Sequence, residues 1–555
     1  MWKYLRMTNS VADLLTSAAR ELPDGMAVVE ASSGRRVTWS ELEDEVDRVA
    51  AGYANEGAVA GYRVMLVLGN RIEFVTSYLG ALRAQLVVVP VNPRSTANEL
   101  ARMLADSGTR IIIADTDTVT VVREALQIVE RARNGEFEGI DPDDLADVPK
   151  PRLVTVGSTL QPGERSYAHL SASHGRALPA LQDPETLAAL LYTSGTSGRP
   201  RAAMLSHRAL LANIEQIAEV QPPMLAADDV VLGVLPLFHV YGLNAVLGAS
   251  LRLRVRVVLA DSFEPGGTLD LIEDEAISVV PVAPPVFAHW LPLDDLAERL
   301  GPVRLVLSGS APLAAEVIDS FVESTGVAVH QGYGLTEAAP VVTSTLCSKD
   351  APTGSVGAAL PGIEIRLRDE AGHDVEGGDP GDIEIRGGNL FSGYWPDGRE
   401  GPDGEGWWAT GDVGFLDTDG DLFLVDKRKD LVIVSGFNVY PSEVEETIAD
   451  VPGVQACAVI GVEDPLTGEA VVAYVVATPD GDEAGLEEAV RARCADRLAR
   501  FKQPTTVHVV DELPYTVTGK VQKGRLRAAA RQRVALFDEP TDEPADQPTD
   551  EASGG

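Results

Sequence analysis

The chain has 555 residues, 45% of them hydrophobic, and its 84 acidic residues against 46 basic ones give a formal net charge of −38. That length and hydrophobic content suffice for at least two domains with buried cores, whereas so negative a charge excludes nucleic acid or an anionic membrane as a partner bound through bulk electrostatics. We expect any anionic ligand to be bound by a local group of donors.

The cysteines and the apolar runs indicate the cellular compartment in which the protein is expected. The three cysteines are too few and too scattered for a disulfide framework or a zinc site, which fits a reducing cytosol. No apolar run approaches the roughly 18 to 20 residues that a membrane-spanning helix needs. We therefore expect a cytoplasmic protein without a transmembrane segment.

A helix beginning after residue 38 is the first strongly marked element. Thr38 and Glu41 have the spacing of a capping box, and Val37 and Leu42 have that of a hydrophobic staple, which predicts a helix to about residue 53. β-rich and helical patterns then alternate, with strands expected at 63–68, 86–91 and 110–114 and helices at 72–84 and 97–105. This alternation predicts a largely parallel sheet covered by helices, followed after 157–184 by a second such unit.

Residues 191–205, LYTSGTSGRPRAAML, have the composition of a phosphate-binding loop. Its hydroxyls and glycines let backbone N–H groups close around an anion, and Arg201 adds a fixed positive charge. An expected strand at 187–191 and an expected helix at 206–214 predict a loop at a strand-to-helix junction. A polar surface turn is the alternative for the loop taken alone, and it is not a Walker loop, because the chain has no GxxxxGK[ST].

Two turns further along carry histidine, aromatic or small residues. After an expected strand at 230–235 comes PLFHVYG, for which packing in the core is the alternative to a site; it contains His239, Tyr241 and Gly242. After an expected strand at 305–308 come three small residues that would let a ligand approach the backbone, namely Gly309, Ser310 and Ala311.

The next motifs frame a region of short strands. QGYGLTE at 331–337 contains Tyr333, Thr336 and Glu337, and a glycine-rich helix entry is its alternative. Residues 354–395 have many turns and predict a small β-barrel subdomain. It closes at WATGD, where Asp412 has an ordinary Asx turn as its alternative.

Taken in order, these motifs resemble those of the adenylate-forming superfamily, which includes acyl-CoA synthetases, luciferases and the adenylation domains of peptide synthetases. Three later stretches continue the resemblance: DKRKD at 426–430, SGFNVYPSEVE at 435–445 and PYTVTGK at 514–520. Each motif is weak singly, but seven in order over roughly residues 8–530 make coincidence implausible.

The resemblance implies a domain plan. A large α/β AMP-binding domain with two helix-covered sheets and a small β-barrel is expected at 8–426, a hinge at 427–430 and a mobile α+β domain at 431–530. Residues 531–555 remain as an acidic tail, and the composition of 538–555, with seven acids and no base, predicts disorder.

The resemblance also implies a nucleotide site and catalytic residues. Tyr333 would face the adenine and Asp412 the ribose, and Glu337 and Thr193 would bind Mg²⁺. The other implied nucleotide contacts are Ser194, Gly195, Thr196, Ser197, Gly198, Arg201, Gly332, Gly334 and either Lys427 or Arg428. The implied catalytic residues are Thr336, Glu337, His239 and Lys520. This chain departs from the family at Arg201, where lysine is usual, and at Ala202, where glycine is usual, but the charge at the first is kept.

Acyl and CoA contacts follow in the same way. The implied acyl pocket consists of His239, Tyr241, Gly242, Gly309, Ser310, Ala311 and Gly332, and the implied CoA contacts are Ser435, Gly436 and Phe437. Lys429 falls on the pivot of the hinge.

The implied activity is ATP-dependent conversion of a carboxylic acid to acyl-AMP and then to a CoA thioester. The small residues Gly309, Ala311, Gly332 and Gly334 suggest an open apolar slot for a medium or long fatty acid. An aryl or short-chain acid ligase, transfer of acyl-AMP to a carrier protein, and a catalytically dead nucleotide-binding scaffold remain the alternatives. The expected partners are the acid, ATP and CoA, without nucleic acid, and the sequence leaves a homodimer open.

Overall fold

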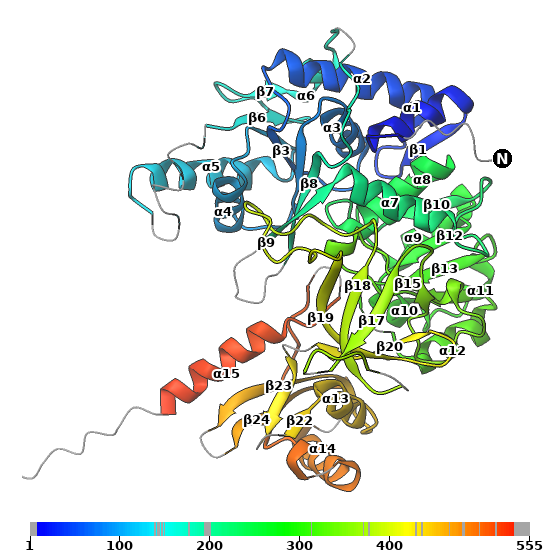
Figure 1. Ribbon diagram of the computed structural model, residues 1–555, viewed down its shortest axis with the longest axis vertical. Helices are drawn as coiled ribbons and strands as arrows, with labels where there is room; N and C mark the ends of the chain where they lie inside the picture. Colours follow the sequence, from blue (N-terminus) through cyan, green and yellow to red (C-terminus); the bar gives the residue numbers. More distant parts are fainter. Residues whose placement is uncertain are drawn as a thin grey trace, which may run out of the picture. The chain divides into compact units, whose positions relative to one another are not determined.

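Two units of unequal size, residues 1–425 and 426–555, make up the computed structural model of the chain (Figure 1). The structure describes residues 8–137, 140, 145, 148, 150–175, 178–193, 201–311, 313–369, 371–375, 378–427, 430–434, 437–464, 467–479, 483–498, 500–516 and 519–537. Of the predicted hinge, Arg428 and Lys429 lie outside these residues, so the hinge stays a prediction.

One sheet of the larger unit has seven described strands in the order β7-β6-β5-β3-β4-β8-β9, parallel except for the antiparallel pair β8 and β9. Alternate residues of β3 face opposite sides, so that Val64 and Leu66 enter one hydrophobic core and Met65 and Val67 another. Both faces are therefore apolar, as in a sheet covered by helices. The strands are β3 Arg63–Val67, β4 Val87–Pro90, β5 Ile111–Ala114, β6 Arg152–Thr155, β7 Arg165–Ser166, β8 Leu187–Thr193 and β9 Arg201–Ser206.

The second sheet has the order β14-β13-β12-β10-β11-β1-β2 and is parallel except for β1 with β2. In β11, Val257 and Leu259 belong to the same hydrophobic core as Val64 and Leu66, here called the first core. Val258 points to the opposite face of the sheet and belongs to a third core. The strands are β1 Met26–Glu30, β2 Arg36–Thr38, β10 Val230–Gly233, β11 Arg256–Leu259, β12 Val279–Val282, β13 Leu305–Ser308 and β14 Ala328–Gln331.

Helices form three layers around the two sheets (Figure 1). The first core lies between the sheets and contains residues of α1 Ala12–Glu21, α2 Trp39–Asn55, α3 Ile72–Arg83, α6 Tyr167–Ser171, α7 His207–Ala218 and α8 Ala249–Leu253. The outer face of the first sheet is covered by α4 Ala97–Ser107 and α5 Val119–Arg133. That of the second is covered by α9 Pro265–Glu275, α10 Pro285–Trp290, α11 Leu296–Arg299 and α12 Ala315–Thr325.

A smaller, curled sheet of the order β17-β18-β19-β20 corresponds to the predicted β-barrel subdomain. Its strands are β17 Glu364–Arg368, β18 Gly381–Arg386, β19 Trp407–Leu416 and β20 Leu422–Lys427, and the pair β15 Thr343–Ser344 and β16 Ala358–Ala359 precedes it. β19 carries Asp412, so this subdomain brings one of the predicted ligand-binding residues to the larger unit.

The smaller unit is an α+β domain. Its sheet has the order β22-β21-β24-β23, and β25 pairs with β24. The elements are β21 Val432–Val434, β22 Phe437–Val439, α13 Pro441–Ala449, β23 Val454–Asp464, β24 Gly468–Ala477, α14 Glu483–Arg497, β25 Thr506–Val509 and α15 Lys523–Phe537. Helix α15 continues to residue 537, so 531–537 were wrongly assigned to the tail; that stretch, RQRVALF, has no glycine or proline to end a helix. The rest of the predicted tail lies outside the described residues.

Local sequence signals fared well where they were strong. The side chain of Thr38 accepts from the backbone N–H of Glu41 and that of Glu41 from Thr38, which confirms the capping box of α2. One expectation fails, because β9 stands between the predicted phosphate loop and α7. The predicted turn in PLFHVYG is present at residues 237–239, and the π-helix η2, Tyr241–Gly248, follows it.

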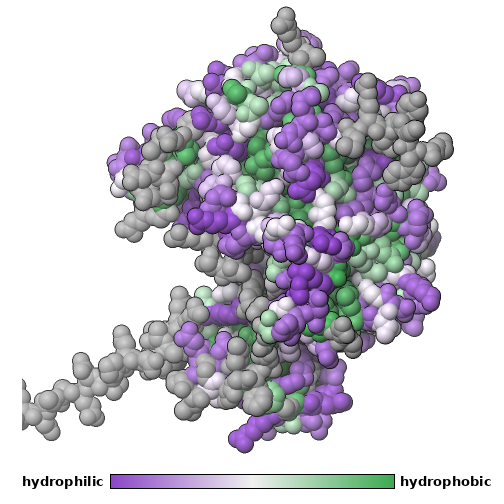
Figure 2. All heavy atoms as spheres, viewed as in Figure 1, coloured by the Kyte–Doolittle hydropathy of each residue, from purple (hydrophilic) through white to green (hydrophobic). Residues whose placement is uncertain are grey.

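Charged and polar side chains dominate the face drawn in Figure 2, with hydrophobic residues in smaller groups between them, as a net charge of −38 leads one to expect. Among the described residues, no helix combines the length and the apolar character that crossing a membrane requires.

Candidate active site

The predicted adenine and ribose residues lie together. Tyr333, in the turn between β14 and the 3₁₀ helix η3 (Thr336–Ala338), donates its hydroxyl to Oδ2 of Asp412 on β19 at 2.6 Å, across 79 residues of sequence. Tyr333 is held in turn by backbone bonds with Thr343 and Val342, and Asp412 is only 7% exposed. Burial, followed by the charge of Asp412, raises the pKa of Tyr333 far above its usual range, so the phenol stays protonated and remains a donor.

The predicted metal ligand has a similar partner. Glu337, at 8% exposure, accepts the hydroxyl of Tyr394 on Oε1 at 2.6 Å. Tyr394 lies in the segment 392–395, which is fixed along β9 by backbone hydrogen bonds that include Trp395 to Ala202 and Met204 to Gly393. Burial, followed by the charge of Glu337, raises the pKa of Tyr394, so this hydroxyl also stays a donor.

Arg201, the first residue of β9, connects to the same group. Its guanidinium carbon lies 3.7 Å from the centroid of the Tyr394 ring, and both of its terminal nitrogens donate to Glu400 at 2.7 Å. The hydrogen-bonded pair with Glu400 raises the pKa of Arg201, and Tyr394 and Glu337 contribute to the same shift. The predicted phosphate-loop cation therefore lies beside the predicted metal ligand.

Of the loop's predicted hydroxyl and glycine residues, only Thr193 is described. It ends β8, is half-buried and donates its hydroxyl to the carbonyl of Arg201 at 3.4 Å, while Ser194, Gly195, Thr196, Ser197 and Gly198 lie outside the described residues. β8 and β9 pair as antiparallel neighbours, so the loop connects two strands, and the strand-to-helix junction expected from the sequence is wrong. The N-terminus of α7, capped by Ser206, follows β9 and is separated from the loop by the whole strand.

The histidine and aromatic turn lies next to the small-residue turn. His239 accepts from the backbone N–H of Tyr241 on Nδ1 at 3.3 Å, and Tyr241 donates weakly to the carbonyl of Leu307 at 3.5 Å. A Cβ added to Gly309 would lie 2.8 Å from Cε1 of Tyr241. The ring of Tyr241 thus fills the space beside Gly309 that the sequence suggested was open.

At three other glycines of the predicted site, the absence of a side chain makes room for neighbouring backbone. A Cβ on Gly242, Gly332 or Gly334 would come within 2.4 to 2.6 Å of a backbone carbonyl oxygen, of Pro236, Thr343 and Pro340 respectively. These glycines allow close approach of backbone segments. They therefore give no support to an open apolar slot, and a contact of Gly242, Gly332 or Gly334 with a ligand stays a prediction. Ser310 has a φ of 75°, a left-handed conformation uncommon for serine.

The smaller unit holds the predicted catalytic lysine in a defined turn. Lys520 is exposed; its backbone N–H donates to Oγ1 of Thr516 at 3.0 Å, and its carbonyl accepts from the N–H of Thr516. Gly519, with a φ of 79°, makes this reversal of the chain without side-chain strain. Of the predicted CoA contacts, Ser435 and Gly436 lie outside the described residues, and Phe437 and the predicted nucleotide contact Lys427 are described only as parts of β22 and β20.

Comparison with known proteins identifies the family. The AMP-binding enzyme family matches residues 15–395, more than half of the chain, and its C-terminal domain matches residues 443–520. The chain belongs to the AMP-binding enzyme family. It is accordingly an acid–thiol ligase of the adenylate-forming superfamily, an acyl-CoA synthetase, and the use of ATP and CoA follows from the family.

Several relatives match along nearly the whole chain. A long-chain-fatty-acid–CoA ligase of Escherichia coli O157:H7 is 33% identical over 95% of this chain and 95% of its own length. The 4-coumarate–CoA ligase 3 of Oryza sativa subsp. japonica is 33% identical over 90% of this chain and 88% of its own. The ATP-bound structure of MatB from Rhodopseudomonas palustris, 32% identical, covers 95% of this chain with all of its own and superposes with a TM-score of 0.82.

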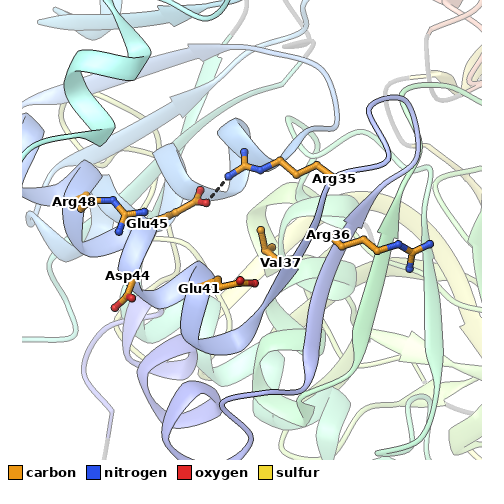
Figure 3. Close-up of a pocket in the computed structure, with 7 residues that line it drawn as sticks. All are labelled: Arg35, Arg36, Val37, Glu41, Asp44, Glu45 and Arg48. Atoms are coloured by element: carbon orange, nitrogen blue, oxygen red, sulfur yellow. Dashed lines mark hydrogen bonds and ion pairs between the residues drawn. The ribbon is translucent and has the colours of Figure 1, made fainter.

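A polar pocket of about 310 Å³ lies elsewhere in this ligase, between β2 and α2 (Figure 3). Most of its charged side chains have partners: Arg35 pairs with Glu45, Arg36 with Glu275, and Glu41 caps α2. None of the predicted site residues lines it. We therefore assign these side chains to the stability of the β2–α2 junction.

Tyr394 and Glu400 are site residues that the sequence patterns did not indicate. Tyr394 falls in the region of short strands and turns at 354–395 and Glu400 just after it, and their partners Glu337 and Arg201 are 57 and 199 residues away. Only the hydrophobic strand pattern before GYW, which places Tyr394 at the end of the β-subdomain, gave a local signal.

Proposed function

We propose that this ligase activates an apolar carboxylic acid, in the first place a fatty acid of medium or long chain, as acyl-AMP and transfers the acyl group to CoA. The proposal rests on one observation above others. The residues predicted for the ribose, the adenine, the metal and the phosphates form hydrogen-bonded or stacked pairs within the larger unit, namely Asp412 with Tyr333, Glu337 with Tyr394, and Arg201 with Tyr394.

The first step needs activation because a carboxylate is a poor electrophile. In this proposal the acid's carboxylate attacks the α-phosphate of ATP in line, and pyrophosphate leaves. Asp412 accepts the ribose hydroxyls, the ring of Tyr333 covers the adenine, and Thr336 donates to the α-phosphate. Arg201 and Lys520 neutralise the charge that develops on the phosphates, so catalysis consists mainly of positioning and electrostatics.

Magnesium fits the donor set beside the phosphates. Among the described residues no group of three or more His, Cys, Asp or Glu side chains could hold a metal by itself. Mg²⁺ is commonly held by one or two carboxylates together with substrate phosphates. We assign Glu337 as this carboxylate and Thr193 as a second oxygen ligand, and the ion would screen the phosphate charge.

In the second step the thiolate of CoA displaces AMP. We assign Lys520 to the first step only, and we assign the exchange of steps to rotation of the smaller unit at Lys429. Ser435, Gly436 and Phe437 then border the thiol, and Lys427 or Arg428 contacts the nucleotide. The few scattered cysteines support action in the cytoplasm.

An aryl or short-chain acid is the second candidate substrate, and a specific contact favours it. The ring of Tyr241 lies against Gly309, where distal methylenes of a long acid were expected to pass. A long chain therefore requires Tyr241 to move, whereas a shorter or aromatic acid does not. The relatives divide in the same way, since they include ligases named for long-chain fatty acids and for 4-coumarate.

A screen of pyrophosphate release decides between these substrates. Straight-chain acids of increasing length, benzoate and 4-coumarate are each supplied with ATP, with and without CoA. We expect the largest kcat/KM for a medium or long fatty acid, and thioester only with CoA. An aromatic optimum would establish the second candidate, and the absence of pyrophosphate release with every acid would refute the proposal that the substrate is an apolar carboxylic acid.

The variant Tyr241→Ala tests in the same screen whether the ring of Tyr241 limits the length of the acid. Each CH₂ that gains a buried site contributes roughly 0.8 kcal/mol, so the variant's advantage should grow with chain length and be absent for benzoate. The control is Tyr241→Phe, which keeps the ring and should leave the preference for chain length unchanged. Leu307→Ala would be a poor control, because Leu307 is part of β13.

A further inference from the structure

The guanidinium of Arg201 is engaged on two sides at once. One face lies on the ring of Tyr394, with the guanidinium carbon 3.7 Å from the ring centroid. Both terminal nitrogens donate to the two carboxylate oxygens of Glu400, each at 2.7 Å. This is the bidentate arrangement in which arginine binds carboxylates and phosphates with equal geometric fit. The edge of the guanidinium that carries both terminal nitrogens is therefore already engaged.

Glu400 is held in place by its backbone. Its φ of 57° lies in the left-handed region, which is uncommon for a residue with a side chain. Its carbonyl accepts the indole N–H of Trp408 at 2.8 Å, and the preceding residue, Arg399, pairs with Tyr394 in a short bridge. A strained conformation persists when surrounding contacts determine it, and it often marks a functional position. Here it directs the carboxylate to Arg201.

The side chain of Glu400 can nevertheless leave. It is 66% exposed, while the side chain of Arg201 is 28% exposed. An ion pair this close to water contributes little to stability, because solvent screens it and can solvate the released carboxylate. Arg201 can keep its stacking on Tyr394 when Glu400 departs, since the ring contacts the face of the guanidinium and the carboxylate contacts its edge.

We propose that Glu400 is an internal competitor of the nucleotide phosphates for Arg201. ATP binding displaces the carboxylate from the guanidinium edge, and the carboxylate returns when pyrophosphate leaves. Glu400 thus weakens the binding of both ATP and pyrophosphate and favours release of the product. The proposal rests on the proposed function, in which Arg201 binds the phosphates of ATP.

The test compares Glu400→Gln with Asp397→Asn in the full chain. Asp397 lies in the same turn, pairs with Arg399 at 2.8 Å and loses the same charge when substituted, so it is a matched control. Calorimetry at low and high salt gives the dissociation constants of pyrophosphate and MgATP. We expect Glu400→Gln to bind both roughly three- to fivefold more tightly than wild type at low salt, with a smaller gain at high salt, since exposed ion pairs are weak and screened. Asp397→Asn should bind as wild type does.

Two further variants separate a specific contact from net charge. Glu400→Asp keeps the charge but shortens the side chain, so it should bind pyrophosphate more tightly if the contact with Arg201 matters. In an Arg201→Gln background, Glu400→Gln should give no further gain, because the contested cation is absent. Equal affinities of Glu400→Gln and Asp397→Asn, or a gain that persists without Arg201, would overturn the proposal.

The outcomes also distinguish this proposal from the ligase function. If wild type bound neither ATP nor pyrophosphate, the proposed function would fail. If wild type bound both and Glu400→Gln matched the control, only the competition would fail. Thermal unfolding of each variant checks that a changed affinity does not come from a damaged fold.

Discussion

Two buried carboxylates of the larger unit are held in the same way but lie in different electrostatic surroundings. Asp412 and Glu337 are 7% and 8% exposed, and each accepts a tyrosine hydroxyl at 2.6 Å, from Tyr333 and Tyr394 respectively. The pKa of Tyr333 is raised mainly by burial, and the charge of Asp412 is the second largest cause. At Tyr394 the charge of Glu337 acts together with those of Arg201 and Glu400.

The difference shows how one local device serves two kinds of ligand. A tyrosine hydroxyl donates to one carboxylate oxygen and so helps to fix the direction in which the carboxylate faces its ligand. Beside Asp412 that ligand is a neutral ribose in our proposal, so no cation is required. Beside Glu337 the ligand is a charged phosphate group with its metal, and the stacked Arg201 supplies positive charge close by.

The largest effect is expected from removing Lys520, the cation that we assign to the phosphates of ATP. Lys520→Ala should lower the rate of adenylation by roughly 10² to 10³-fold, because a charge aimed at the developing phosphate charge is lost. Conversion of supplied acyl-AMP and CoA to thioester should remain near the wild-type rate, because we assign Lys520 to the first step only. Single-turnover measurements of the two half-reactions give both rates. An equal loss in both would contradict the assignment of Lys520.

The second largest effect is expected from replacing Glu337, the carboxylate that we assign to the metal beside the phosphates. Glu337→Gln should lower adenylation by roughly 10²-fold, because hydrogen bonds and metal contacts of an ionised group are stronger than those of an amide. The deficit should diminish as Mg²⁺ is raised. Metal affinity, measured by Mn²⁺ binding in the presence of ATP, provides a readout apart from turnover. An unchanged metal affinity would show that Glu337 acts without the metal.

Asp412→Asn tests the adenosine end. ATP binding should weaken by roughly 10- to 100-fold, since the ribose hydroxyls lose an ionised acceptor. Wild type should also discriminate against 2′-deoxy-ATP, and the variant should discriminate much less. Its Mg²⁺ dependence should match that of wild type. If the variant bound ATP normally and still rejected the deoxynucleotide, another residue would bind the ribose.

The sequence predicted what local patterns determine. The capping box at Thr38 and Glu41 depends on residues three apart, and the strands and helices up to residue 114 follow apolar patterns of period 2 or 3.6. The ordered motifs located Tyr333, Glu337 and Asp412, and the hydrogen bond between the first and last was outside their reach because it joins residues 79 apart.

Other features depended on tertiary contacts that local patterns do not contain. β9 is a six-residue strand, RAAMLS, with weak β propensity, and its pairing with β8 and with the segment 392–395 stabilises it. The glycines at 332 and 334 indicated a ligand slot, whereas the structure uses them for close backbone contacts with Thr343 and Pro340. A glycine's φ or neighbour cannot be inferred from its letter alone.

The smallest effects are expected from removing the two tyrosine hydroxyls, and they test the comparison of Asp412 with Glu337 most directly. Tyr333→Phe and Tyr394→Phe each remove one hydroxyl and keep the ring, so each should cost about fivefold, the former in ATP affinity and the latter in adenylation rate. The two should differ in their response to salt. Without the hydroxyl of Tyr394, Glu337 is free to turn toward Arg201, and the attraction between them weakens as salt screens it. The deficit of Tyr394→Phe relative to wild type should therefore shrink as ionic strength rises, while that of Tyr333→Phe should stay constant. If both deficits responded equally to salt, the two carboxylates would differ only in position, and the charge of Arg201 would play no part in orienting Glu337.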